Sequence, residues 1–257
     1  MIISVKQLAI LFLIIARLAG VFIRAPLFNS RSFPFVGKTA IVIWTSIVLW
    51  FVTPVFPLLP TTMPGFITAI LMEVALGFVI GFICDIIFIA IQAAGEIADM
   101  QMGLSVATAL DPVFGAVISV IGRLSFFLAL IIFITANGHH LLLTALQQSF
   151  TVLPVGHFAN FTSPDMAQQI IGLGGALWVT GIKLAAPAVL LIFISDFTFG
   201  VVSRVAPQVN VFMLGFQVKP SLGIFALLLT LPFILKYVNN LVGVMMTQIT
   251  FMLSAVK

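Results

Sequence analysis

The sequence predicts an all-α integral membrane protein with about six hydrophobic helical elements. Hydrophobic residues make up 62% of the chain and charged residues only 7%, whereas roughly 25% of the residues in a soluble globular protein are charged. The apolar residues gather in long runs, without the alternation of apolar and polar residues that a transmembrane β-barrel requires. In lipid, a helix pairs the backbone N–H and C=O groups of such a run with each other.

Six apolar runs are each close to, or longer than, the roughly 20 residues with which a helix crosses a bilayer. They cover residues 7–28, 39–59, 66–94, 124–147, 170–201 and 222–253. Basic residues recur in alternate connections, which places the first, third and fifth connections in the cytoplasm. Because these residues are scattered and form no patch, nucleic acid is not an expected partner.

The third run has a polar stripe of Glu73, Gly77, Gly81 and Asp85 at every fourth residue, which places all four on one helical face. The spacing of the two glycines is typical of closely packed membrane helices. One interpretation is a packing face against other parts of the protein. The other is the lining of a conduit, in which water solvates the two carboxylates.

Polar residues also interrupt the last two runs. Lys183 and Asp196 lie about 20 Å apart along the fifth helix, so they cannot pair with each other. One face of the sixth run collects polar or small residues, namely Lys236, Asn240, Gly243 and Thr247. We expect this face to avoid lipid and Lys236 to pair with an acid on another helix or subunit.

Residues 92–112 form a polar island in this apolar chain. Three of the seven acidic residues fall inside it, Glu96, Asp99 and Asp111, together with Gln92 and Gln101. Ionisable groups are costly to keep beside lipid. The island is therefore expected to be a functional segment.

Two features invite a catalytic or metal-binding interpretation. Ser105 lies close to Gly103, and His139 and His140 are candidate bases for a serine nucleophile. Adjacent histidines, however, point about 100° apart on a helix, and no third ligand lies at the spacing of a metal site. The chain also lacks a glycine-rich phosphate loop. The sequence therefore predicts a protein that is not an enzyme and holds no metal or cofactor.

Several short segments, in order along nearly the whole chain, resemble the family of FliR, the flagellar type III secretion export-gate protein, whose virulence-secretion counterpart is SctT. They are Arg17 with Arg24 to Pro26, Ala94 to Ile97, Gln101 to Ser105, Asp111-Pro112, Asn137 to His139, and Ala206 to Phe212 with Gly215-Phe216. The resemblance to the flagellar branch is closer, mainly through residues 101–105.

The resemblance implies a core subunit of the flagellar export gate in the bacterial inner membrane, at the basal body. In this family the subunit forms a conical channel with FliP and FliQ, is joined by FlhB, and passes unfolded flagellar proteins. It also implies one domain of helical hairpins, in which residues 1–147 hold the N-terminal helices and residues 167–257 form a C-terminal hairpin. The assembled gate lies largely out of the bilayer plane, so the apolar runs need not all cross it.

The resemblance further implies a channel plug at about residues 102–122. Small residues in this segment would let it move aside. The residues expected to carry plugging or gating are Met102, Gly103, Ser105, Leu110, Asp111, Pro112, Phe114 and Gly115.

Two other functions are consistent with the sequence. One is the corresponding gate subunit of an injectisome. The other is a small-molecule secondary transporter that uses Glu73, Asp85, Lys183 and Lys236 as midplane sites. The chain lacks a clear internal repeat, which such transporters usually have.

Overall fold

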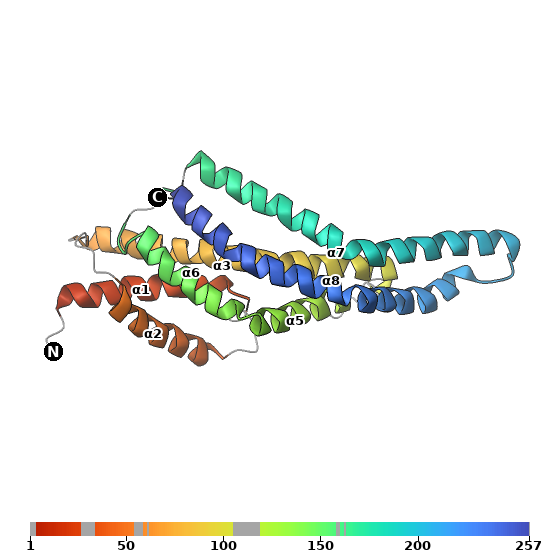
Figure 1. Cartoon of the computed structure of the whole chain (residues 1–257), viewed down its shortest axis with the longest axis horizontal. Helices are drawn as coiled ribbons and strands as arrows, with labels where there is room; N and C mark the ends of the chain where they lie inside the picture. Colours follow the sequence, from red (N-terminus) through yellow and green to blue (C-terminus); the bar gives the residue numbers. More distant parts are fainter. Residues whose placement is uncertain are drawn as a thin grey trace. The chain divides into compact units, whose positions relative to one another are not determined.

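The computed structural model describes residues 4–26, 34–53, 59–60, 62–104, 119–157, 160–161 and 163–256. All regular secondary structure in these ranges is α-helical, which confirms the predicted all-α fold (Figure 1). The helices are α1 (Val5–Arg24), α2 (Phe35–Val52), α3 (Met63–Met102), α5 (Val120–Thr135), α6 (Gly138–Val152), α7 (Pro164–Val205) and α8 (Val211–Val256).

Six helical stretches in the described residues are long and apolar enough to cross a membrane. They are α1, α2, α3, α7 and the two parts of α8 on either side of residue 230, and α5 with α6 would make a seventh if counted as one span. The predicted number of hydrophobic elements is confirmed, although the fourth predicted run corresponds to the bent pair of α5 and α6 and the sixth overlaps both parts of α8. The chain has the composition of a multi-pass membrane protein.

The fourth and sixth runs differ from their predicted extents. The fourth run is broken after Thr135, where Asn137 has a left-handed backbone with φ 56°, a conformation that asparagine tolerates better than most residues. The sixth helix begins at Val211, eleven residues before the predicted start at residue 222, and it includes Pro220. Polar residues near Lys219 lower the local hydropathy without ending the helix.

The chain divides into two compact units. The first contains Met1–Ile86, Ile134–Gly174 and Leu241–Lys257, and the second contains Ile87–Phe133 and Gly175–Asn240. In the second unit, α7 and α8 run antiparallel and are joined through residues 206–210 (Figure 1).

The outer faces of this hairpin are strongly apolar. Phe193 and Phe197 of α7 are 65% and 71% exposed, and Leu228 and Phe233 of α8 are 63% and 73% exposed. Large apolar patches on a protein surface mark contact with lipid or with other proteins.

Candidate functional site

The predicted plug segment begins and ends in one buried cluster of the second unit. Met102, at the end of α3, is 0% exposed, and Ile121, in the first turn of α5, is 3% exposed. Both belong to a group of packed apolar side chains that also contains Ala98, Ala188, Ile192 and Ala226. Leu104 packs against the same cluster, so the described residues on both sides of 105–118 contact one core.

Most of the predicted plug lies outside the described residues. Six of its predicted residues fall there, namely Ser105, Leu110, Asp111, Pro112, Phe114 and Gly115. Met102 and Gly103 are described, and so are Ser119 to Gly122 on the returning side.

Gly103 ends α3 in a conformation that favours glycine. Its φ is +79°, and its N–H donates to the carbonyl oxygen of Met100 at 3.2 Å. A Cβ at this position would lie 3.5 Å from the nearest ring carbon of Phe216, which is ordinary contact. The positive φ, and not a lack of space, therefore accounts for the glycine.

The returning chain is fixed by a cap and a glycine contact. The Ser119 hydroxyl accepts from the Gly122 N–H at 2.8 Å, as a helix N-cap does. A Cβ on Gly95 of α3 would lie 2.7 Å from the Gly122 Cα, and a Cβ on Gly122 would lie 2.8 Å from the Glu96 Cγ. Gly95 therefore cannot accept a side chain without movement of the backbone of α5, whereas a side chain at Gly122 would first displace the side chains of Glu96 and Ser119.

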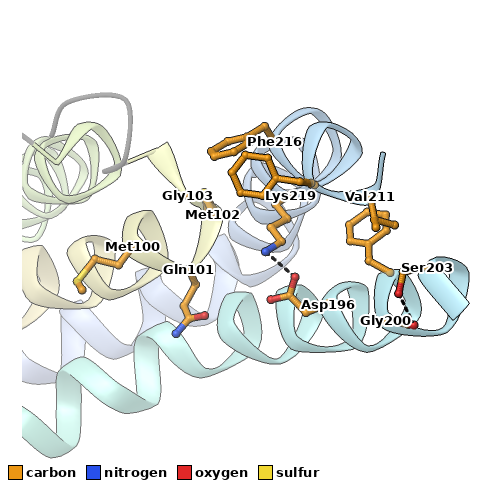
Figure 2. Close-up of a pocket in the computed structure, with 13 residues that line it drawn as sticks. Met100, Gln101, Met102, Gly103, Asp196, Gly200, Ser203, Val211, Phe216 and Lys219 are labelled. Atoms are coloured by element: carbon orange, nitrogen blue, oxygen red, sulfur yellow. Dashed lines mark hydrogen bonds and ion pairs between the residues drawn. The ribbon is translucent and has the colours of Figure 1, made fainter. Parts of the chain in front are cut away.

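An open pocket of about 570 Å³ lies beside the end of α3 (Figure 2). Its walls come from three helices of the second unit: Met100 to Gly103 from α3, Asp196, Phe199, Gly200 and Ser203 from α7, and Val211, Phe212, Gly215, Phe216 and Lys219 from α8. Lys219 Nζ and Asp196 Oδ1 lie 2.5 Å apart and connect α7 with α8. Methionine and phenylalanine side chains form an adaptable apolar surface.

The polar island has three different environments. Gln92 donates to Glu96 Oε1 at 2.9 Å, and Gln101 is exposed on the pocket wall. Asp99 is 2% exposed, and its Oδ1 has no hydrogen-bond partner among the described residues. In the described part of the island, Glu96 is thus hydrogen-bonded, Asp99 is buried, and Gln101 lines the pocket.

The polar stripe of α3 lies against α1 in the first unit. A Cβ on Gly77 would collide with the backbone carbonyl of Arg17, and one on Gly81 would lie 2.6 Å from the Val21 carbonyl oxygen. A Cβ on Gly20 of α1 would likewise collide with the carbonyl oxygen of Val74 in α3. Close contact between glycines is how membrane helices pack without large side chains, so this stripe is in contact with protein.

Two ion pairs flank this glycine contact. Arg17 Nε lies 2.5 Å from Glu73 Oε2, with the side chains 0% and 1% exposed. Arg24 Nη1 lies 3.5 Å from Asp85 Oδ2 at a partly exposed position. The two carboxylates that a transporter would use as midplane sites are thus paired within the chain.

Arg17 is the centre of a wider buried network. Its Nη1 donates to the Ser149 hydroxyl at 3.1 Å and its Nη2 to the Leu153 carbonyl oxygen at 3.0 Å. The guanidinium also lies 4.3 Å from the centre of the Phe150 ring, and the Gly156 N–H donates to Glu73 Oε1 at 3.0 Å. The network joins α1, α3, α6 and the residues after α6.

The sequence interpretation missed this role of Arg17. The available signal was a pair of arginines seven residues apart in the first run and a pair of acids twelve residues apart on one face of the third. Two basic residues on one helix and two acids on another identify ion-pair partners only once the two helices are known to be adjacent and parallel.

The remaining polar residues predicted to be important are exposed. Lys183, Lys236 and Asn240 all lie on exposed parts of α7 and α8. Neither lysine forms an ion pair within the part of the chain that the structure describes. Among the same residues, no group of three or more histidine, cysteine or acidic side chains has the arrangement of a metal site.

The chain is similar in sequence to flagellar biosynthetic proteins and to a Yop translocation protein. The flagellar biosynthetic protein FliR of Bacillus subtilis (strain 168) is 30% identical over 229 residues, which cover 89% of this chain and 88% of that protein. FliR of Pectobacterium carotovorum subsp. carotovorum is 31% identical over 232 residues, 88% of this chain and 85% of that protein. Yop proteins translocation protein T of Yersinia pestis is 27% identical over 185 residues, 72% of this chain and 71% of that protein.

These relatives are named for flagellar biosynthesis and protein translocation, and none of the three names states a catalytic activity. The sequence pattern of the family described as "Bacterial export proteins, family 1" matches residues 8–245, almost the entire chain. The chain therefore belongs to the bacterial export proteins of family 1, the FliR family of type III secretion.

Proposed function

We propose that this chain is a core subunit of the flagellar export gate in the bacterial inner membrane. With FliP and FliQ it forms the channel that passes unfolded flagellar proteins, and it is joined by FlhB. The flagellar branch is favoured over the injectisome branch because FliR of Bacillus subtilis matches 89% of the chain at 30% identity. The Yersinia translocation protein matches 72% at 27% identity.

In this proposal, residues 102–122 act as the plug of the channel. The observation that carries the proposal is the shared anchoring of the two ends of the segment, because Met102 and Ile121 pack in the same buried cluster. A segment with fixed ends can change its path while the surrounding helices keep their packing. Gly103, with its positive φ, supplies the point at which the chain turns away from α3.

The exposed apolar faces of α7 and α8 support the assembly part of the proposal. Large side chains such as Phe197 and Phe233 are 71% and 73% exposed on the isolated chain. Partner subunits and lipid would cover them in the assembled gate.

Deletion of residues 110–115 tests the plug in the complete assembly. The gate is produced with its partner subunits, purified and placed in vesicles, and ion leakage is measured by dye release or conductance. Leakage is expected to rise, because the deletion shortens the segment without touching Met102 or Ile121. An unchanged leak in a fully assembled gate would remove the plug from the proposal.

A matched control keeps the length of the segment constant. Replacement of residues 110–115 by six glycine and serine residues tests whether the side chains or the length of the segment closes the channel.

Purification of the wild-type particle tests the proposed assembly. Loss of the partner subunits from that particle would contradict it.

A further inference from the structure

Two exposed lysines of the second unit lie in apolar surroundings. On α7, Lys183 shares its helical face with Val179 and Leu190, which are 51% and 60% exposed. On α8, Lys236 shares its face with Leu229 and Phe233, which are 56% and 73% exposed. We call Lys183, Lys236 and these four apolar residues the lysine band.

The two lysines lie at a similar level of the α7–α8 hairpin. The Thr180 and Tyr237 hydroxyl groups are 3.0 Å apart and fix the register of the two antiparallel helices. Lys183 follows Thr180 by three residues and Lys236 precedes Tyr237 by one, so both lie on the same side of this contact. At a rise of about 1.5 Å per residue, their levels differ by only about 3 Å.

Neither lysine can reach a polar boundary at a helix end. Lys183 is 19 residues from the start of α7 and 22 from its end, or roughly 28 and 33 Å at about 1.5 Å per residue. These distances are several times the length of a lysine side chain, so neither helix end can supply a polar partner. Within the apolar part of a bilayer, a lipid-facing ammonium group at this level would be left without a partner, which is costly.

Most acids in the described residues already have a partner or are buried. Glu73, Asp85 and Asp196 form ion pairs, Glu96 accepts from Gln92, and Asp99 is 2% exposed. The sixth, Asp165, is exposed in the first turn of α7. One such carboxylate on a second copy cannot pair with both lysines, so we expect the complementary charge to come from a different protein.

We propose that the lysine band docks a partner protein whose apolar helices carry acidic side chains at the level of Lys183 and Lys236. The apolar residues of the band pack against those helices, and each ammonium group pairs with a carboxylate. The inference rests on the proposed assembly function in that it requires a partner, and it adds the chemistry by which that partner is recognised.

Zero-length crosslinking of the assembled wild-type particle tests the contact directly. A carbodiimide joins an amine to a carboxylate that touches it, and mass spectrometry then identifies the two residues. Crosslinks from Lys183 or Lys236 to acids in a partner's apolar helix are expected. Crosslinks from these lysines to another copy of the same chain, or none from either lysine, would overturn the proposal.

A double variant, Lys183→Met with Lys236→Met, provides the second measurement. Methionine keeps the apolar packing but removes both charges, so partner recovered with the tagged chain should fall about tenfold or more, because partner acids are left unpaired. Lys6→Met is the matched control, since Lys6 is exposed in the first turn of α1. The amount of each variant in membranes, without partners, shows whether it folds and inserts.

The outcomes separate the inference from the proposed function. Full partner recovery by the double variant overturns the lysine band alone, because the assembly then forms without the two charges. A wild-type chain that recovers no partner overturns both the assembly and the band. Loss of recovery in the double variant but not in Lys6→Met supports the band.

Discussion

Arg17 of α1 and Glu73 of α3 form an ion pair 56 residues apart in the chain, with Nε and Oε2 at 2.5 Å and both side chains buried. Hydrogen bonds from Arg17 to Ser149 and Leu153, and from the Gly156 N–H to Glu73, complete the group. A buried charge is tolerated when it is paired and its remaining hydrogen-bonding positions are occupied. The pair therefore fixes α1 against α3 and α6 in one arrangement.

Glu73→Gln should destabilise the protein strongly. Removal of one partner from a buried ion pair costs about 3–5 kcal/mol, because the other charge stays buried without compensation. The apparent melting temperature in detergent measures the loss. The double variant Arg17→Met with Glu73→Met should be more stable than Glu73→Gln alone, and a double variant that is equally unstable would argue against the pair as the cause.

Gly77→Ala should separate α1 from α3. The added methyl group would collide with the backbone carbonyl of Arg17, which cannot move without shifting α1. Gly175→Ala is the matched control, because its Cβ would meet nothing within 4 Å and alanine is favoured over glycine in a helix by about 1 kcal/mol. Thermal unfolding should therefore show a loss at residue 77 and no loss at residue 175.

Gly103→Ala should strain the end of α3. A left-handed conformation costs a residue with a Cβ about 1–2 kcal/mol, and the φ of Gly103 is +79°. In Gly215→Ala, by comparison, the new Cβ would lie 3.6 Å from the Lys219 side chain, an ordinary contact. Equal unfolding temperatures for the two variants would show that the backbone at residue 103 relaxes without cost.

Asp196→Asn should change stability only slightly. Asp196 and Lys219 are 43% and 26% exposed, and ion pairs with such access to water typically contribute about 0–1 kcal/mol. The effect should shrink further when unfolding is measured at high salt, because ions screen exposed charges. A large, salt-independent loss would mean that the pair is covered in the assembled protein.

The sequence predicts the helices and their polar faces better than their partners. Each predicted hydrophobic run overlaps a helix, because apolar runs of this length have few alternatives to a helix. The spacing of Glu73, Gly77 and Gly81 identifies one face of α3, but two interpretations of that face remain until α1 is placed beside it. Pairing depends on which helices are neighbours, and hydrophobic periodicity carries no such information.

The misplaced boundaries have local causes. Asn137 interrupts the fourth run through its left-handed backbone, which a hydropathy average over many residues does not resolve. Residues 211–221 are helical although Lys219 and Pro220 lower their apolar character. For the candidate site, the sequence identifies Met102 and Gly103 as the start of a special segment, but not the packing of Met102 with Ile121 that anchors it.

The network around Arg17 also sets an order of events during synthesis. Its partners are made later: Glu73 follows by 56 residues and Leu153 by 136. At a translation rate of about 5–20 residues per second, Glu73 arrives roughly 3–11 s after Arg17, and Leu153 roughly 7–27 s after it. During that interval the charge of Arg17 on α1 has no partner. The packing position of α1 against α3 and α6 is therefore fixed only after most of the first unit has been synthesised.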